Sequence, residues 1–160
     1  MKVKNMVIIA SFAALSVVLS LVKVWQMPNG GSISLYLVPL MFIAFKFDFK
    51  SSLTCCLITA ILQIILSGYI IGFFQVILDY ILPVCAISLF SLVRNKNVEF
   101  IIPVAFVIGI LMLGSYVLSG MVYFKVNFIG SVMYNATFFI PTYLISIVLM
   151  SVLNKIKLEV

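Results

Sequence analysis

The chain has 160 residues, of which 65% are hydrophobic and only 9% are charged, and its formal net charge at pH 7 is +6. Soluble domains carry about 25% charged residues, so this composition excludes a water-facing globular domain. A membrane-spanning helix needs about 20 residues, which allows at most about six spans and no aqueous catalytic or nucleotide-binding domain. We therefore expect an all-α polytopic membrane protein in which residues 1–160 form a single domain of six transmembrane helices.

The apolar runs fix the expected spans in chain order. The first run, about 5–24, follows Lys2 and Lys4; its length and the lack of a small-x-small cleavage site predict a span rather than a signal peptide. A polar loop over 25–32 separates it from a short second span that contains Pro39. Continuously apolar runs indicate helices rather than the alternating strands of a β-barrel. The later spans are expected at about 33–47, 52–67, 70–93, 100–123 and 129–153.

The basic residues predict the orientation in the membrane. With six spans, both termini lie on one side, and that side holds all the Lys and Arg residues except Lys23 and Lys125. The positive-inside rule then places both termini of this multi-pass membrane protein, together with the loops over 46–50 and 94–99, in the cytoplasm. The basic residues form no stripe, so we expect membrane lipid and no nucleic acid among the partners.

Several kinds of chemistry are not expected. Cys55, Cys56 and Cys85 lie inside apolar runs, where cysteines usually behave as small hydrophobic residues. The chain has no histidine and no close cluster of carboxylates, so we expect no metal site and no cofactor. It also lacks the G-x-x-x-x-G-K phosphate loop. With few catalytic groups available, we expect no catalytic residues and no enzymatic activity, and any ATP hydrolysis would belong to partner subunits.

Asp79 is the acidic residue that no loop explains, because it lies about nine residues inside the fourth predicted span. An ionised carboxylate at that depth costs on the order of 3 kcal/mol, so it needs a partner or a function. One interpretation is a structural ion pair with Lys23 or Lys125, or a protonated carboxyl group. The interpretation that we favour is a counter-charge for a cationic ligand that enters from outside.

Other polar and aromatic side chains at membrane depth support a ligand site. Aromatic rings around a lone carboxylate suit a flat organic cation, through stacking, cation–π contact and the counter-charge. Tyrosine and tryptophan also gather at membrane interfaces, so the combination with Asp79 and Asn135 carries the prediction rather than any one ring. The residues singled out on this basis are Gln75, Tyr80, Tyr116, Gly120, Tyr134, Asn135 and Trp25.

The first span carries Ala10 and Ala14 four residues apart. Small residues at this spacing allow another helix to approach closely, which favours helix association in lipid. The partner is either another subunit or one of the chain's own spans, and the spacing does not choose between them.

Five stretches of the chain together form a recognisable pattern: 27–35 (MPNGGSISL), 38–40 (VPL), 75–80 (QVILDY), 118–120 (LSG) and 134–135 (YN). In this order, and over nearly the whole chain, they resemble the thiamine-specific S components, the substrate-binding membrane subunits of energy-coupling-factor (ECF) transporters. The resemblance implies a six-helix bundle whose outward pocket, capped by the loop after the first span, binds thiamine. A coupling subunit and two ATPase subunits would drive its release inward.

The resemblance also implies roles for individual residues. Asp79 would meet the cationic ligand, Tyr80 and Asn135 would hydrogen-bond it, and Tyr69 and Trp25 would be a pocket tyrosine and a rim aromatic. Ala10 and Ala14 would contact the coupling subunit, and they are the predicted partner-contact residues. The candidate ligand-binding residues are Asp79, Tyr80, Asn135, Tyr116, Gly120, Tyr69, Trp25, Gln75, Tyr134 and Phe124.

The chain departs from the family pattern at two positions. Tyr116 stands where the family usually has a histidine, and Thr142 follows Pro141 where the family often has an acidic residue. The expected ligand is therefore thiamine or a close relative, including a precursor or a related pyrimidine or thiazole. The alternatives are a stand-alone proton-coupled carrier of a small organic cation and a membrane scaffold subunit that transports nothing.

Overall fold

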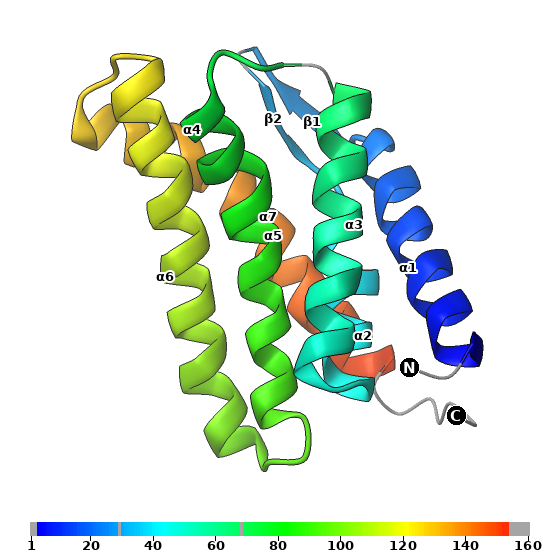
Figure 1. Ribbon diagram of the computed structural model, residues 1–160. Helices are drawn as coiled ribbons and strands as arrows, with labels where there is room; N and C mark the ends of the chain where they lie inside the picture. Colours follow the sequence, from blue (N-terminus) through cyan, green and yellow to red (C-terminus); the bar gives the residue numbers. More distant parts are fainter. Residues whose placement is uncertain (1–2, 29, 68, 154–160) are drawn as a thin grey trace.

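A computed structural model describes residues 3–28, 30–67 and 69–153, which form a bundle of long helices with a small hairpin at one end (Figure 1). Five helical segments in the described chain are long and apolar enough to cross a membrane, and a sixth, shorter apolar helix packs among them. The six-helix bundle expected from the sequence is confirmed.

The elements follow the predicted order, with two additions. A two-stranded antiparallel hairpin occupies the region after the first helix, and the fourth span consists of four consecutive helical segments. The elements before the fourth span are α1 (Val3–Leu21), β1 (Trp25–Met27), β2 (Gly30–Ile33), α2 (Leu37–Lys46) and α3 (Phe49–Ser67). The fourth span comprises α4 (Phe73–Val76), the π-helix η1 (Ile77–Ile81), α5 (Leu82–Ala86) and the 3₁₀-helix η2 (Ile87–Val93). The last two elements are α6 (Val98–Tyr123) and α7 (Phe128–Leu153).

Helix α2 is the centre of the packed core. Five of its ten residues have no exposed surface, and α1, α3, η2 and α7 pack around it. Outer helix faces have the opposite character: Ile102, Phe106 and Ile110 on α6 are more than half exposed and apolar. This distribution suits a bundle surrounded by lipid, where the helices satisfy their own backbone hydrogen bonds and present apolar side chains outward.

The region 25–32, which the sequence predicted as a polar loop, is instead partly ordered as the hairpin β1–β2. Trp25 pairs with Ile33, and Gln26 pairs with Ser32. The hairpin extends the chain at the end of α2, which at ten residues is only about 15 Å long and cannot cross a bilayer alone. The hairpin therefore accounts for part of the length that the short helix α2 lacks among the full-length spans.

The arrangement of the ends agrees with an even number of crossings. Helix α1 begins and α7 ends at the same end of the bundle, and the hairpin lies at the opposite end (Figure 1). The assignment of these ends to the cytoplasm and the exterior stays a prediction from the positive-inside rule.

Several boundaries differ from the sequence prediction. Helix α2 begins at Leu37 rather than near residue 33, and the fourth span begins at Phe73 rather than near residue 70, so 69–72 lie outside the helices. Helix α3 begins at Phe49 rather than near residue 52, because Asp48 caps it. One carboxylate oxygen of Asp48 accepts a hydrogen bond from the Ser51 hydroxyl at 2.7 Å, and the other accepts one from the Ser51 amide at 3.3 Å. Such caps satisfy backbone N–H groups that have no partner within the helix.

The cap gives a prediction that depends on pH. The hydrogen bond from the Ser51 hydroxyl holds the pKa of the Asp48 carboxyl below its usual value of 3.8. Because the folded pKa is the lower one, this stabilisation is present at neutral pH and is lost as the pH falls through the folded pKa. We expect Asp48→Ala to lower the free energy of unfolding by about 1 kcal/mol at pH 7.

Thermal unfolding of the detergent-solubilised protein at several pH values measures the effect. The stability difference between wild type and Asp48→Ala should shrink on acidification below about pH 4. Asp48→Asn is the matched control, because its amide oxygen still caps the helix but does not titrate. A difference that is the same at all pH values would exclude the charged cap.

Candidate functional site

Asp79 lies on the π-helical segment η1, in the middle of the fourth span. A π turn holds one residue more than an α turn, and such segments occur frequently at functional sites. The irregular backbone is supported from α6, where the Ser115 hydroxyl donates to the Leu78 carbonyl oxygen at 2.5 Å. The Asp79 side chain is partly buried, so a carboxylate stands at membrane depth on a locally irregular helix.

The neighbours of the Asp79 carboxylate are uncharged. Oδ2 accepts a hydrogen bond from the Gln75 side-chain amide at 2.7 Å, and the Ser119 hydroxyl of α6 lies nearby. Ser119 is buried, and its hydroxyl is a hydrogen-bonding neighbour of the Asp79 carboxyl group. Lys23 and Lys125 are both exposed, and within the described chain neither pairs with Asp79. The structural ion pair that the sequence left open is therefore absent from this part of the chain.

Tyr116 occupies a polar and aromatic environment next to Asp79. Its hydroxyl lies 3.2 Å from the Tyr36 hydroxyl, and the rings of Phe138 and Phe139 are each 5.8 Å from its ring, centroid to centroid. The hydroxyl is also close enough to Asp79 to interact with it electrostatically. Tyr36 was missed by the sequence reasoning, which treated it as part of an apolar run. A tyrosine at the start of that run was the available signal.

Asn135 is buried on α7 and ties this helix to α6. Its Nδ2 donates to the Ser131 carbonyl at 2.8 Å and to the Ser131 hydroxyl at 3.3 Å. It also reaches the Tyr116 carbonyl at 3.4 Å, and the Ser131 hydroxyl donates to the Val117 carbonyl at 2.9 Å. The structure thus brings Asn135 to the backbone of Tyr116 and adds Ser131 as a residue that the sequence reasoning missed.

Gly120 contributes space rather than a functional group. A Cβ at this position would run into the Ser131 hydroxyl and would lie 3.5 Å from the Asn135 amide nitrogen. The absence of a side chain lets α6 and α7 approach closely where Asn135 makes its contacts. Gly120 therefore shapes the site through the packing of two helices.

A second aromatic group lies at the beginning of the fourth span. The Tyr69 ring stacks on Phe124 with a centroid distance of 6.1 Å and an interplanar angle of 13°. The Tyr80 hydroxyl donates to the Tyr69 carbonyl at 3.4 Å. Tyr69, Tyr80 and Phe124, which were predicted as site residues, therefore lie together on the side of the 69–72 segment.

The hairpin rests on α7. Gly31 has a positive φ of 61°, and a Cβ there would come within 2.6 Å of the Phe138 ring, so only glycine fits this approach. The Tyr134 hydroxyl donates to the Gly30 carbonyl at 3.2 Å, and the Thr142 hydroxyl donates to the Ser32 carbonyl at 3.4 Å. Because Phe138 also contacts Tyr116, the hairpin is joined to the polar site through α7.

Trp25 lies on β1 of this hairpin and is 56% exposed. It pairs with Ile33 in the hairpin, and its role as a rim aromatic stays a prediction. No described contact joins its ring to Asp79.

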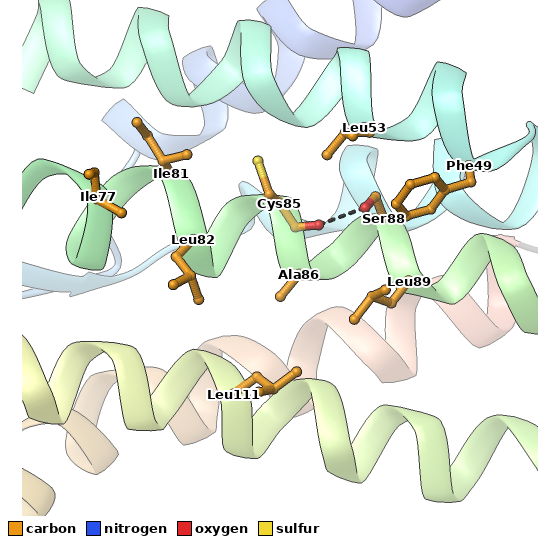
Figure 2. Close-up of a pocket in the computed structure, with 10 residues that line it drawn as sticks. All are labelled: Phe49, Leu53, Ile77, Ile81, Leu82, Cys85, Ala86, Ser88, Leu89 and Leu111. Atoms are coloured by element: carbon orange, nitrogen blue, oxygen red, sulfur yellow. Dashed lines mark hydrogen bonds between the residues drawn. The ribbon is translucent and has the colours of Figure 1, made fainter.

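A groove in the described structure lies away from Asp79. It has a volume of about 440 Å³ and lies between α3, the fourth span and α6 (Figure 2). Its lining is mostly apolar and includes Leu53, Leu82, Leu89 and Leu111. The Ser88 hydroxyl also lines it but donates a hydrogen bond to the Cys85 carbonyl oxygen at 2.7 Å. None of the predicted ligand-binding residues lines it. An apolar groove of this kind does not suit a cationic ligand, so we place the candidate site at Asp79.

Comparison with known proteins decides the family. Residues 6–160 match the thiamine transporter protein family (Thia_YuaJ). The chain belongs to the thiamine transporter family. The thiamine transporter ThiT of Bacillus subtilis (strain 168) is 28% identical over 167 residues, which cover 91% of this chain and 87% of that protein. Membership makes this chain a multi-pass membrane protein of a transporter family, as the sequence predicted.

A solved structure supports the fold of this family member. ThiT from Listeria monocytogenes superposes with a TM-score of 0.81 at 21% sequence identity, covering 96% of this chain and 94% of the Listeria chain. The match extends over all six helices rather than over a local segment.

The glycine between α6 and α7 gives a prediction with an internal control. In this member of the thiamine transporter family, Gly120→Ala should destabilise the fold by about 1–3 kcal/mol, because the new methyl group must displace Ser131. Gly114→Ala on the same helix meets no atom within 4 Å and should not destabilise the fold, because alanine is favoured over glycine inside a helix by about 0.5–1 kcal/mol. Thermal unfolding of both variants measures the difference. Equal melting temperatures would contradict the close approach at Gly120.

Proposed function

We propose that this chain is the thiamine-capturing S component of an ECF-type importer and that it catalyses no reaction itself. The observation that carries the proposal is the Asp79 carboxylate, which stands at membrane depth with no cationic partner among the described residues. In a chain of the thiamine transporter family, such a carboxylate is the natural counter-charge for the permanently cationic thiazolium ring of thiamine.

The surroundings of Asp79 supply the other contacts that a flat cation needs. Tyr80 and Tyr116 offer rings and hydroxyl groups, and stacking or cation–π contact with such rings contributes about 0.5–2 kcal/mol each. The buried Ser119 hydroxyl adds a further polar group beside the carboxylate. Desolvation of the carboxylate is partly offset by pairing with the cation, so a net gain requires a well-matched geometry.

The remaining candidate residues form three pairs in this proposal. Asn135 and Gly120 form the side of the site between α6 and α7, and Tyr69 and Phe124 form the outer aromatic pair. Tyr134 and Trp25 belong to the hairpin side: Tyr134 holds the hairpin through the Gly30 carbonyl, and Trp25 lies on the hairpin. We assign Tyr116, where the family usually has a histidine, to the floor of this pocket.

The energy for transport comes from other subunits in this proposal. The chain has no phosphate-binding loop, so we assign ATP hydrolysis to two partner ATPases and its transmission to a coupling subunit. Helix α1 offers the contact surface. Ile9, Ala13 and Ser16 face inward and are almost completely buried, whereas Ala10 and Ala14 are exposed. Their exposure favours contact with a partner helix over packing within the chain.

Removal of the counter-charge tests the capture function. Asp79→Asn should abolish tight thiamine binding without unfolding the protein, because the amide keeps the shape but loses the charge. Titration of thiamine while following the fluorescence of Trp25, the single tryptophan, measures binding, with calorimetry as a second readout.

Asp48→Asn removes a carboxylate outside the site and should bind as wild type does. The pyrimidine and thiazole halves of thiamine, titrated separately, show which part carries the affinity. An Asp79→Asn variant with wild-type affinity would overturn the role of the carboxylate. Transport of a cation by the purified chain alone, driven by a pH gradient, would instead favour the proton-coupled carrier.

Enlargement of the α1 surface tests the partner contact. Ala14→Trp should leave thiamine binding unchanged but stop ATP-driven uptake in liposomes that also contain the coupling subunit and the ATPases, because the bulky ring prevents close helix approach. Ile110→Trp, at an exposed position on α6, is the matched control and should transport normally. Normal uptake by Ala14→Trp would exclude this face of α1 as the contact.

A further inference from the structure

The Gln75 side chain is 1% exposed and lies one helical turn before Asp79. The sequence suggested that it contacts the ligand. Its hydrogen bonds point elsewhere. Nε2 donates to Asp79 Oδ2 at 2.7 Å and to the Tyr69 carbonyl at 3.4 Å, and Oε1 accepts the Ile71 backbone N–H at 3.2 Å.

These three hydrogen bonds give every polar atom of the Gln75 amide group a partner within the protein. A primary amide has two N–H donors and one carbonyl oxygen. Both donors and the oxygen of Gln75 are engaged, and the Ile71 N–H fixes which end of the amide is the oxygen. A ligand could hydrogen-bond the Gln75 nitrogen only by displacing Asp79 or the Tyr69 carbonyl.

We propose that Gln75 is a positioning residue that holds the Asp79 carboxylate and the 69–72 segment in one fixed geometry and does not bind the ligand. The part concerning the ligand rests on the proposed function, because it takes Asp79 as the counter-charge. The part concerning the segment rests on the ligand-free structure alone.

The geometry explains why such a residue is needed here. Residues 69–72 lie outside the helices, so their backbone groups need partners from elsewhere. Gln75 supplies a partner to Tyr69 and to Ile71, and the Tyr80 hydroxyl adds a second one to the Tyr69 carbonyl. The two side chains that hold this segment therefore flank Asp79 in the sequence.

The same bond orients the carboxylate. A hydrogen bond to a charged group is stronger than a neutral one, and a carboxylate held by such a bond cannot rotate freely. Asp79 then meets a cation without first losing side-chain freedom, which lowers the cost of binding. Gln75 acts on the ligand through Asp79.

The first experiment needs no ligand. We expect Gln75→Met, which has a similar length but no hydrogen-bonding groups, to speed hydrogen exchange of the Ile71 amide about tenfold or more, as loss of its partly buried hydrogen bond to Gln75 predicts. Gln75→Glu keeps an oxygen that accepts the Ile71 N–H and should preserve its protection. Size-exclusion chromatography and melting temperatures establish that both variants fold. An Ile71 amide that exchanges at the wild-type rate in Gln75→Met would overturn the positioning of the segment.

The second experiment separates indirect action from ligand contact by a double-mutant cycle with thiamine as the probe. Gln75→Met should weaken thiamine binding about tenfold in the wild-type background, because Asp79 loses its charge-assisted bond. In the Asp79→Asn background, the same substitution should change the affinity less than about twofold. An equal loss in both backgrounds would mean that Gln75 touches the ligand directly and would overturn the proposal.

The two experiments also separate this inference from the proposed function. If the wild-type protein does not bind thiamine, the proposed function fails, whereas the exchange rate of the Ile71 amide still decides whether Gln75 positions the segment.

Discussion

A carboxylate among apolar helices must be hydrogen-bonded, and the hairpin end of this bundle is organised around that requirement at Asp79. The backbone around Asp79 is a π-helical turn, which Ser115 of α6 supports through the Leu78 carbonyl. Gln75 donates to the carboxylate from the preceding turn. The charge is therefore stabilised by uncharged dipoles rather than by a lysine, which leaves it able to attract a cation.

The hairpin and the aromatic residues form the other half of the arrangement. Gly31 allows the hairpin to lie against Phe138, and Phe138 packs on Tyr116. The Tyr116 hydroxyl meets that of Tyr36, whose backbone carbonyl accepts a hydrogen bond from the Ser16 hydroxyl of α1 at 2.6 Å. The chain of contacts thus extends from the hairpin through the site to α1, the helix whose outer face carries Ala10 and Ala14.

The sequence predicted the features that depend on composition. Continuous apolar runs located the helices, and the isolated Asp79 identified the centre of the candidate site. The hairpin was missed because Pro28, Gly30 and Gly31 are typical of loops, and its strands of three and four residues are too short to show alternation. The Tyr36–Tyr116 contact joins residues 80 positions apart, and no local pattern encodes it. The spacing of Gln75 and Asp79 was visible, but only the contacts of its amide show what Gln75 does.

The π-helical turn has a further consequence for how the fourth span tolerates change. One residue in an α-helix corresponds to a rotation of about 100° around the helix axis. The additional residue in Ile77–Ile81 therefore determines how α4, which precedes it, is rotated relative to α5, which follows it. The segment that carries Gln75 faces the polar site, while α5 faces the core with Pro83 and Val84. Deletion of a single apolar residue from this turn would rotate α4 against α5 and turn Gln75 away from its partners, although it would barely change the hydropathy of the span. In this stretch the number of residues is therefore under tighter constraint than their chemical identity.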